Sequence, residues 1–146
     1  MDTQPMEILL VEDNEDDIML EREAIAEAKL INLMYVVRDG VEAMAFLRRE
    51  GQDQNAQVPG LILLDINMPK KNGFEVLNEI KAEPALMHIP VVMLTTSDNE
   101  ADIVKSYAKG ACSYITKPMD FDKFREVVKQ FALYWALVAR IPAHAR

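Results

Sequence analysis

The sequence predicts an α/β protein with a doubly wound, five-stranded parallel sheet and helices on both faces. Short apolar runs, typical of strands that are buried on both faces, alternate along the chain with segments of helical character. The alternation repeats five times, which favours right-handed crossovers between parallel strands and helices that cover both sides of the sheet.

Five segments are expected to form strands. Three are continuous apolar runs and two are shorter, weaker candidates: Met6–Val11, Gly60–Leu64, Ile89–Leu94 (reaching Thr95), and then Leu33–Val37 and Cys112–Thr116. Because Cys112 heads one of these strands, we expect it to be a buried, unreactive thiol. As the only cysteine, it excludes a disulfide framework.

Helices are expected between the strands, each after a residue that can cap its N-terminus. The caps are Asn14, Asp39, Asn72 and Asp98, and the helices are 16–28, 41–49, 73–81 and 100–109, with a last helix from about residue 120. Gly110 is expected just past the end of the fourth helix. The last helix carries one apolar stripe: Phe124, Val128, Phe131, Trp135 and Val138.

Length and charge limit the class of protein. The chain has 146 residues, 50% hydrophobic and 27% charged, which predicts one folded domain over 6–138 between short tails at 1–5 and 139–146, without room for an effector domain. A net charge of −8 disfavours direct binding to DNA or to an anionic membrane. No apolar run approaches the ~20 residues of a membrane span, so we expect a soluble, cytoplasmic protein.

Acidic residues follow two of the expected strands. Glu12 and Asp13 come directly after the first strand, and Asp65 follows the third. Ligands of open parallel sheets bind beyond the carboxyl ends of the strands, so these carboxylates converge if the two strands are neighbours. Three carboxylates repel one another unless a cation joins them, and oxygen ligands favour a hard ion such as Mg²⁺.

Two other strands, the fourth and the fifth, end at Thr95 and directly before Lys117. A carboxylate, a divalent cation, a hydroxyl and a lysine together form a site for phosphoryl transfer, with the carboxylate as nucleophile. Taken singly, each residue also has an ordinary role as a helix cap, a loop acid or a surface lysine. Their shared position at one sheet edge favours the functional interpretation.

Four motifs carry a resemblance to a known family: ILLVEDN (8–14), LILLDINMPKKNGFEVL (61–77), PVVMLTTS (90–97) and GACSYITKPMD (110–120). The chain resembles the receiver domain of two-component response regulators over about residues 6–138. The resemblance implies a flavodoxin-like fold with the strand order 2-1-3-4-5. It also implies a signalling protein that catalyses only its own phosphorylation and dephosphorylation, not a multi-turnover enzyme.

The resemblance also implies a role for each site residue. Asp65 matches the phosphoacceptor, Glu12 and Asp13 the acidic pair that holds Mg²⁺, Asn67 the metal ligand acting through its carbonyl, Lys117 the phosphoryl-pairing lysine, and Thr95 and Tyr114 the two switch residues. Phosphorylation would then change the surface that meets a partner. A narrower similarity, in VVRDGVEAMAFLRREG (36–51) and SYITKPMD (113–120), is to stand-alone receivers paired with phytochrome-type histidine kinases.

Three other classes of protein were weighed. A haloacid-dehalogenase-type phosphatase needs a second aspartate two residues after its nucleophile, and Asn67 stands there. A flavodoxin-type electron carrier needs a phosphate-binding first loop, whereas VEDNEDD (11–17) repels phosphate. A purely structural interaction module stays open and predicts no Mg²⁺ dependence.

The end of the last helix is apolar around its circumference. Its residues Leu133, Tyr134, Trp135, Leu137 and Val138 span more than one turn, so one face can pack on the sheet while another meets water or a partner. We expect a symmetric homodimer through this helix, since exposed apolar patches are unusual on a soluble monomer. Coverage by the C-terminal tail is the alternative.

Overall fold

The computed structural model describes residues 6–27, 32–48, 59–68, 70–95, 100–117 and 121–139. Strands and helices alternate throughout. In chain order they are β1 (Met6–Val11), α1 (Glu15–Glu27), β2 (Asn32–Val37), α2 (Gly40–Leu47), β3 (Leu61–Asp65), α3 (Gly73–Ala82), β4 (Val91–Thr95), α4 (Glu100–Ala108), β5 (Ser113–Thr116) and α5 (Phe121–Ala139).

All five strands are parallel and lie in the order β2-β1-β3-β4-β5, which confirms the predicted fold and strand order. The register sets Val11 beside Leu64, and Asp65 beside Leu94. Consequently the carboxyl ends of β1, β3 and β4 lie at one edge of the sheet.

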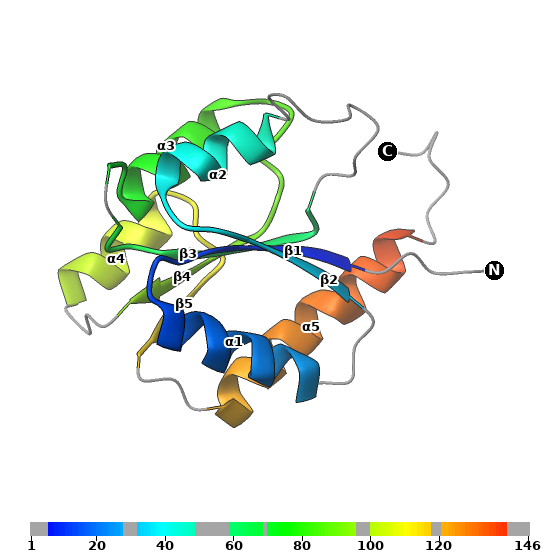
Figure 1. Ribbon diagram of the computed structural model, residues 1–146. Helices are drawn as coiled ribbons and strands as arrows, with labels where there is room; N and C mark the ends of the chain where they lie inside the picture. The colour runs from blue at the N-terminus through cyan, green and yellow to red at the C-terminus, as the bar shows by residue number, and fades with distance from the viewer. Residues whose placement is uncertain are drawn as a thin grey trace.

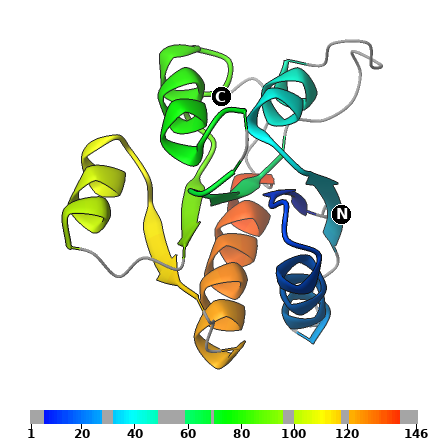
Figure 2. The ribbon, with the colours of Figure 1, turned by 60° about the vertical axis from the view of Figure 1, so that its left-hand side comes forward.

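The helices form a layer on each side of the sheet (Figure 1, Figure 2). Helices α1 and α5 cover one face, and α2, α3 and α4 lie on the other. Two apolar clusters fill the spaces between the layers, one under α2 and α3 and the other under α1 and α5.

Alternate residues of each central strand pack into opposite clusters, which explains why the sequences of these strands are unbroken apolar runs. Leu9 and Val11 belong to the cluster under α2 and α3, while Ile8 and Leu10 belong to the one under α1 and α5. All five residues of β3 are buried. The central strands are therefore buried on both faces of the sheet.

Three of the predicted caps are present. The Asn14 side chain accepts from the Asp17 N–H (3.0 Å), Asp39 accepts from the Glu42 N–H (2.8 Å), and Asn72 forms a reciprocal capping box with Glu75. Asp98 lies outside the described residues. These caps fix the first turns of α1, α2 and α3, the turns nearest the carboxyl edge of the sheet.

Gly110 ends α4 as predicted. Its φ of 102° lies in the left-handed region, and its N–H donates to the Tyr107 carbonyl while the Ala111 N–H donates to that of Ser106. This pair of bonds is the Schellman arrangement, in which glycine carries the least strain.

The expectation for Cys112 was wrong, because its thiol is exposed. Strand β5 begins one residue later, at Ser113, and is an edge strand in which Ile115 is buried, Ser113 and Tyr114 are half-buried and Thr116 is exposed. Of the predicted tails at 1–5 and 139–146, the structure describes only Ala139, the last residue of α5, so the proposed domain limits stay a prediction. Within the described ranges, no helix is long and apolar enough to cross a membrane.

Truncation of a core leucine tests this distribution of burial. Leu77 on α3 is fully buried, whereas Leu20 on α1 is 42% exposed. We expect Leu77→Ala to lower the free energy of unfolding by about 2–5 kcal/mol, because it removes buried methyl groups and leaves a cavity. The matched Leu20→Ala change should cost about 1 kcal/mol or less in the same urea titration. Equal losses would contradict the burial described here.

Candidate functional site

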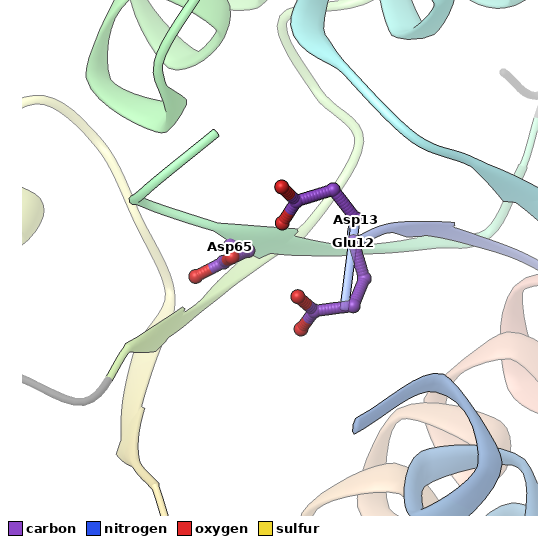
Figure 3. Close-up of side chains that lie close together, drawn as sticks. All are labelled: Glu12, Asp13 and Asp65. Carbon is purple, nitrogen blue, oxygen red and sulfur yellow. The ribbon is translucent and has the colours of Figure 1, made fainter. Parts of the chain in front are cut away.

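The ends of β1 and β3 bring three predicted site residues together. Glu12 and Asp13 follow β1, and Asp65 is the last residue of the adjacent β3. One carboxylate oxygen from each lies within 4.8 Å of the other two, and the three groups point toward a common space beyond the strands (Figure 3). Asp13 is exposed there, whereas Glu12 and Asp65 are buried.

Burial and mutual repulsion disfavour the charged form of Asp65. Removal from water, followed by the charge of Glu12, raises its pKa from 3.8 to about 7, although Lys117 and the Asn67 N–H act in the opposite direction. A second positive charge near the cluster would restore the carboxylate. The donor set, made of carboxylate oxygens, suits a hard divalent cation, so the residues present fit such an ion.

Lys117, just past β5, reaches this cluster with an almost fully buried side chain. Its ammonium donates to Glu12 Oε1 (2.5 Å) and to Asp17 Oδ2 (2.9 Å), and lies 3.8 Å from Asp65 Oδ1. Burial alone would lower the pKa of Lys117, but the hydrogen bonds that it donates to Glu12 and Asp17 outweigh this effect and raise the pKa, so the group stays charged.

The loop after Asp65 is tightly fixed. The Asn67 N–H donates to Asp65 Oδ1 (3.4 Å), and the Gly73 N–H donates to the Ile66 carbonyl (2.9 Å). A Cβ on Gly73 would lie 2.5 Å from the Asp65 carbonyl oxygen, so only glycine allows α3 to start this close to the acceptor. Lys70 adopts a φ of 67° and pairs with Asp39 (3.4 Å), which ties the loop to α2.

The two predicted switch residues lie on adjacent strands. Thr95 ends β4 and pairs in register with Thr116 of β5, while Tyr114 is opposite Met93. Tyr114 is partly buried and packs against the cluster under α2 and α3. The Thr95 side chain lies outside the described side chains, so its role and that of Tyr114 stay predictions.

Sequence reasoning missed two acidic residues on α1. Asp17 pairs with Lys117, and Glu21, one turn further along the helix, is fully buried with both carboxyl oxygens lacking a hydrogen-bond partner. Burial, followed by the charge of Glu12, raises the pKa of Glu21 to about 9, so it is neutral near pH 7. Its spacing from Ile18, Ala24 and Ile25 was the available signal, because it places an acid on the apolar face of α1.

Comparison with known proteins identifies the family. The family model for the response regulator receiver domain matches residues 8–129. Response regulator Rcp1 of Synechocystis sp. is 42% identical over 139 residues, which cover 95% of each chain. Its Mn²⁺-bound crystal structure superposes with a TM-score of 0.77, covering 95% of this chain and all of that one.

Two further solved structures are similar. The phosphorylated cyanobacterial phytochrome response regulator RcpA is 48% identical, with a TM-score of 0.79 over 96% of this chain and 100% of that one. The bacteriophytochrome response regulator RtBRR is 41% identical, with a TM-score of 0.81 over 96% of this chain and 86% of that one. The chain belongs to the response regulator receiver family, whose members are signalling proteins that bind a divalent metal.

The buried Glu21 makes a prediction about stability and pH. The folded protein keeps its Glu21 proton up to about pH 9, whereas the unfolded chain releases it near pH 4.5. The free energy of unfolding therefore falls as the pH rises from about 4.5 to about 9, because only the unfolded chain releases the proton in this range. Glu21→Met should raise the free energy of unfolding at pH 7 by about 1–3 kcal/mol and flatten its pH dependence, because it removes an unpartnered buried carboxyl group.

Urea unfolding in EDTA, at several pH values between 4.5 and 9, measures this effect without interference from metal. Glu23→Met, at an exposed position of the same helix, is the control and should keep the wild-type slope. A Glu21→Met protein that is less stable than wild type at pH 7, or equally sensitive to pH, would contradict the assignment.

Proposed function

We propose that this protein is a single-domain response regulator that accepts a phosphoryl group on Asp65 from a histidine kinase, in a Mg²⁺-dependent reaction. The observation that carries the proposal is the position of Asp65, buried at the end of β3, with Glu12 and Asp13 close by and the Lys117 ammonium at 3.8 Å. These groups match the needs of phosphoryl transfer, which are a nucleophile and positive charge around the transferred group.

In the proposed reaction an Asp65 carboxylate oxygen attacks the phosphorus of a phosphohistidine. The new P–O bond forms as the P–N bond breaks, and the bonding electron pair stays on the imidazole nitrogen. Lys117 neutralises negative charge on the transferred group. Mg²⁺, when bound, would supply further positive charge. The carboxylates of Asp13 and Asp65 and the main-chain carbonyl of Asn67 would hold the ion, and Glu12 would act through a water molecule.

The same groups would later assist attack by water on the acyl phosphate, so the protein would catalyse its own phosphorylation and dephosphorylation. Asn67 argues against a multi-turnover phosphatase, since an amide cannot donate or accept the catalytic proton at this position. An interaction module that works without a metal would not explain why the carboxylates of Glu12, Asp13 and Asp65 converge.

Phosphorylation would bias a two-state switch. Thr95 would move toward the phosphoryl oxygens and Tyr114 would follow into the vacated space. The loose packing of α4 supports such a movement, because Ser106 is buried on this helix while the larger side chains of Val104 and Tyr107 are exposed. The changed surface would lie on α4, β5 and α5, where a downstream protein could bind.

The names of two relatives support a phytochrome-type histidine kinase as the partner: the phytochrome response regulator RcpA is 48% identical to this chain, and the bacteriophytochrome response regulator RtBRR is 41% identical. The net charge of −8 argues against direct DNA or membrane binding. We therefore place the protein in the cytoplasm, together with the kinase domain it would serve.

We further propose a symmetric homodimer through α5. Leu133 is 63% exposed on this helix, which supports an apolar surface there. The side chains of Tyr134, Trp135, Leu137 and Val138 lie outside the described side chains, so their part in the interface rests on the sequence. Such a dimer would use the helix that follows β5, whereas the switch residue Tyr114 of β5 packs on the other face of the sheet, against the cluster under α2 and α3.

Replacement of the acceptor tests the chemistry. Asp65→Asn should abolish labelling by acetyl phosphate or by a kinase, because the amide is not a nucleophile, and EDTA should abolish labelling of the wild type. Asp16→Asn, which removes an exposed charge from α1, should be labelled normally. Acid-labile label that persists in Asp65→Asn would exclude Asp65 as the acceptor.

Light scattering after size exclusion tests the dimer. At ~100 µM, well above typical nM to µM affinities, the wild type should elute with twice the monomer mass. Trp135→Ala should shift the mass toward the monomer, while Met87→Ala, at a 51% exposed position before β4, should not. A wild-type monomer at this concentration would rule the dimer out.

A further inference from the structure

Lys117 is shared among three carboxylates, and the phosphoacceptor is the most distant of them. The ammonium lies 2.5 Å from Glu12 and 2.9 Å from Asp17, both hydrogen-bond distances, but 3.8 Å from Asp65. For Lys117 to contact a phosphoryl group on Asp65, it has to leave at least one of its present partners.

Asp17 is held in its position by the start of α1. Its N–H donates to the Asn14 side chain (3.0 Å), and the Ile18 N–H donates to the Asn14 carbonyl (2.9 Å). Asp17 therefore occupies the first helical turn with a fixed backbone, and its side chain is 30% exposed where it meets Lys117. Because its backbone is already fixed, Asp17 competes with Asp65 for the lysine at a small cost in conformational entropy.

The two partners of Lys117 differ in what a metal ion would do to them. Glu12 belongs to the three-carboxylate cluster, so a bound cation would compete with Lys117 for its charge. Asp17 is outside that cluster and would keep its full attraction for Lys117. After metal binding, Asp17 is the competitor that remains against a phosphoryl group on Asp65.

We propose that Asp17 is a positioning residue for phosphoryl acceptance: it holds Lys117 away from Asp65 in the unphosphorylated protein and so disfavours the phosphorylated form. The proposal rests on the proposed function of Asp65 and Lys117. It assigns a regulatory effect to an acidic residue whose position in the first turn would otherwise suggest only helix capping.

Beryllofluoride, a phosphoryl mimic that bonds to a carboxylate oxygen, measures the effect directly. In saturating Mg²⁺, calorimetry should show that Asp17→Asn binds it about 2- to 5-fold more tightly than wild type, because a partly exposed ion pair no longer has to break. Asp16→Asn removes the same charge from the same turn and is the matched control. Asp17→Glu should restore weaker, wild-type-like binding.

A double-mutant cycle separates positioning from a structural effect. In a Lys117→Gln protein, Asp17→Asn should no longer tighten binding, because the lysine through which Asp17 acts is absent. Thermal unfolding checks that each variant is folded, and Asp17→Ser replaces Asp17→Asn if that variant is not. A gain that persists in the Lys117→Gln protein would overturn the proposal.

Two negative results have different meanings. Wild-type protein that binds beryllofluoride and is labelled on Asp65, but shows no gain in Asp17→Asn over Asp16→Asn, would overturn the role of Asp17 alone. Wild-type protein that neither binds beryllofluoride nor is labelled would overturn the proposed function, and the role of Asp17 with it.

Discussion

The carboxylates of Glu12 and Asp65 are buried side by side at the ends of two neighbouring strands, where water screens their repulsion poorly. Lys117, which follows β5 at the same edge of the sheet, offsets part of this charge. The pKa of Asp65 is still raised, because burial and then the charge of Glu12 outweigh the effect of the lysine. A further cation at the site, or a change in the partner of Lys117, would therefore alter the charge of the Asp65 carboxyl group.

The fold tolerates these buried charges because the apolar residues that stabilise it and the charged residues of the site lie in different regions. Apolar side chains on both faces of β1, β3 and β4 form the two cores, and the polar residues begin where these strands end. The close contact of Gly73 with the Asp65 carbonyl and the capping of α1 by Asn14 hold the edge rigid. Such a frame fixes positions within the short distances that phosphoryl transfer requires.

The sequence was sufficient for the strand order, three of the four caps and the convergence of Glu12, Asp13 and Asp65, because each follows from local residue patterns or from motifs of the family. It misjudged Cys112, because it placed this residue inside a buried strand, whereas β5 begins at Ser113 and lies at the sheet edge that the implied strand order already gave it. It could not give the partners of Lys117, because the choice between Asp17 and Asp65 depends on about an ångström of side-chain position. Glu21 was missed because acids on a helix usually face water.

The central claim is that Asp65, and no other carboxylate of the cluster, carries the phosphoryl group. Borohydride reduces an aspartyl phosphate to homoserine, so mass spectrometry of the phosphorylated, reduced and digested wild-type chain locates the acceptor without any substitution. The account predicts homoserine in place of Asp65 in the peptide that contains DINMPKK (65–71), dependent on Mg²⁺ during phosphorylation. Homoserine in place of Asp13, or an unmodified 65–71 peptide from protein that carries phosphate, would contradict it.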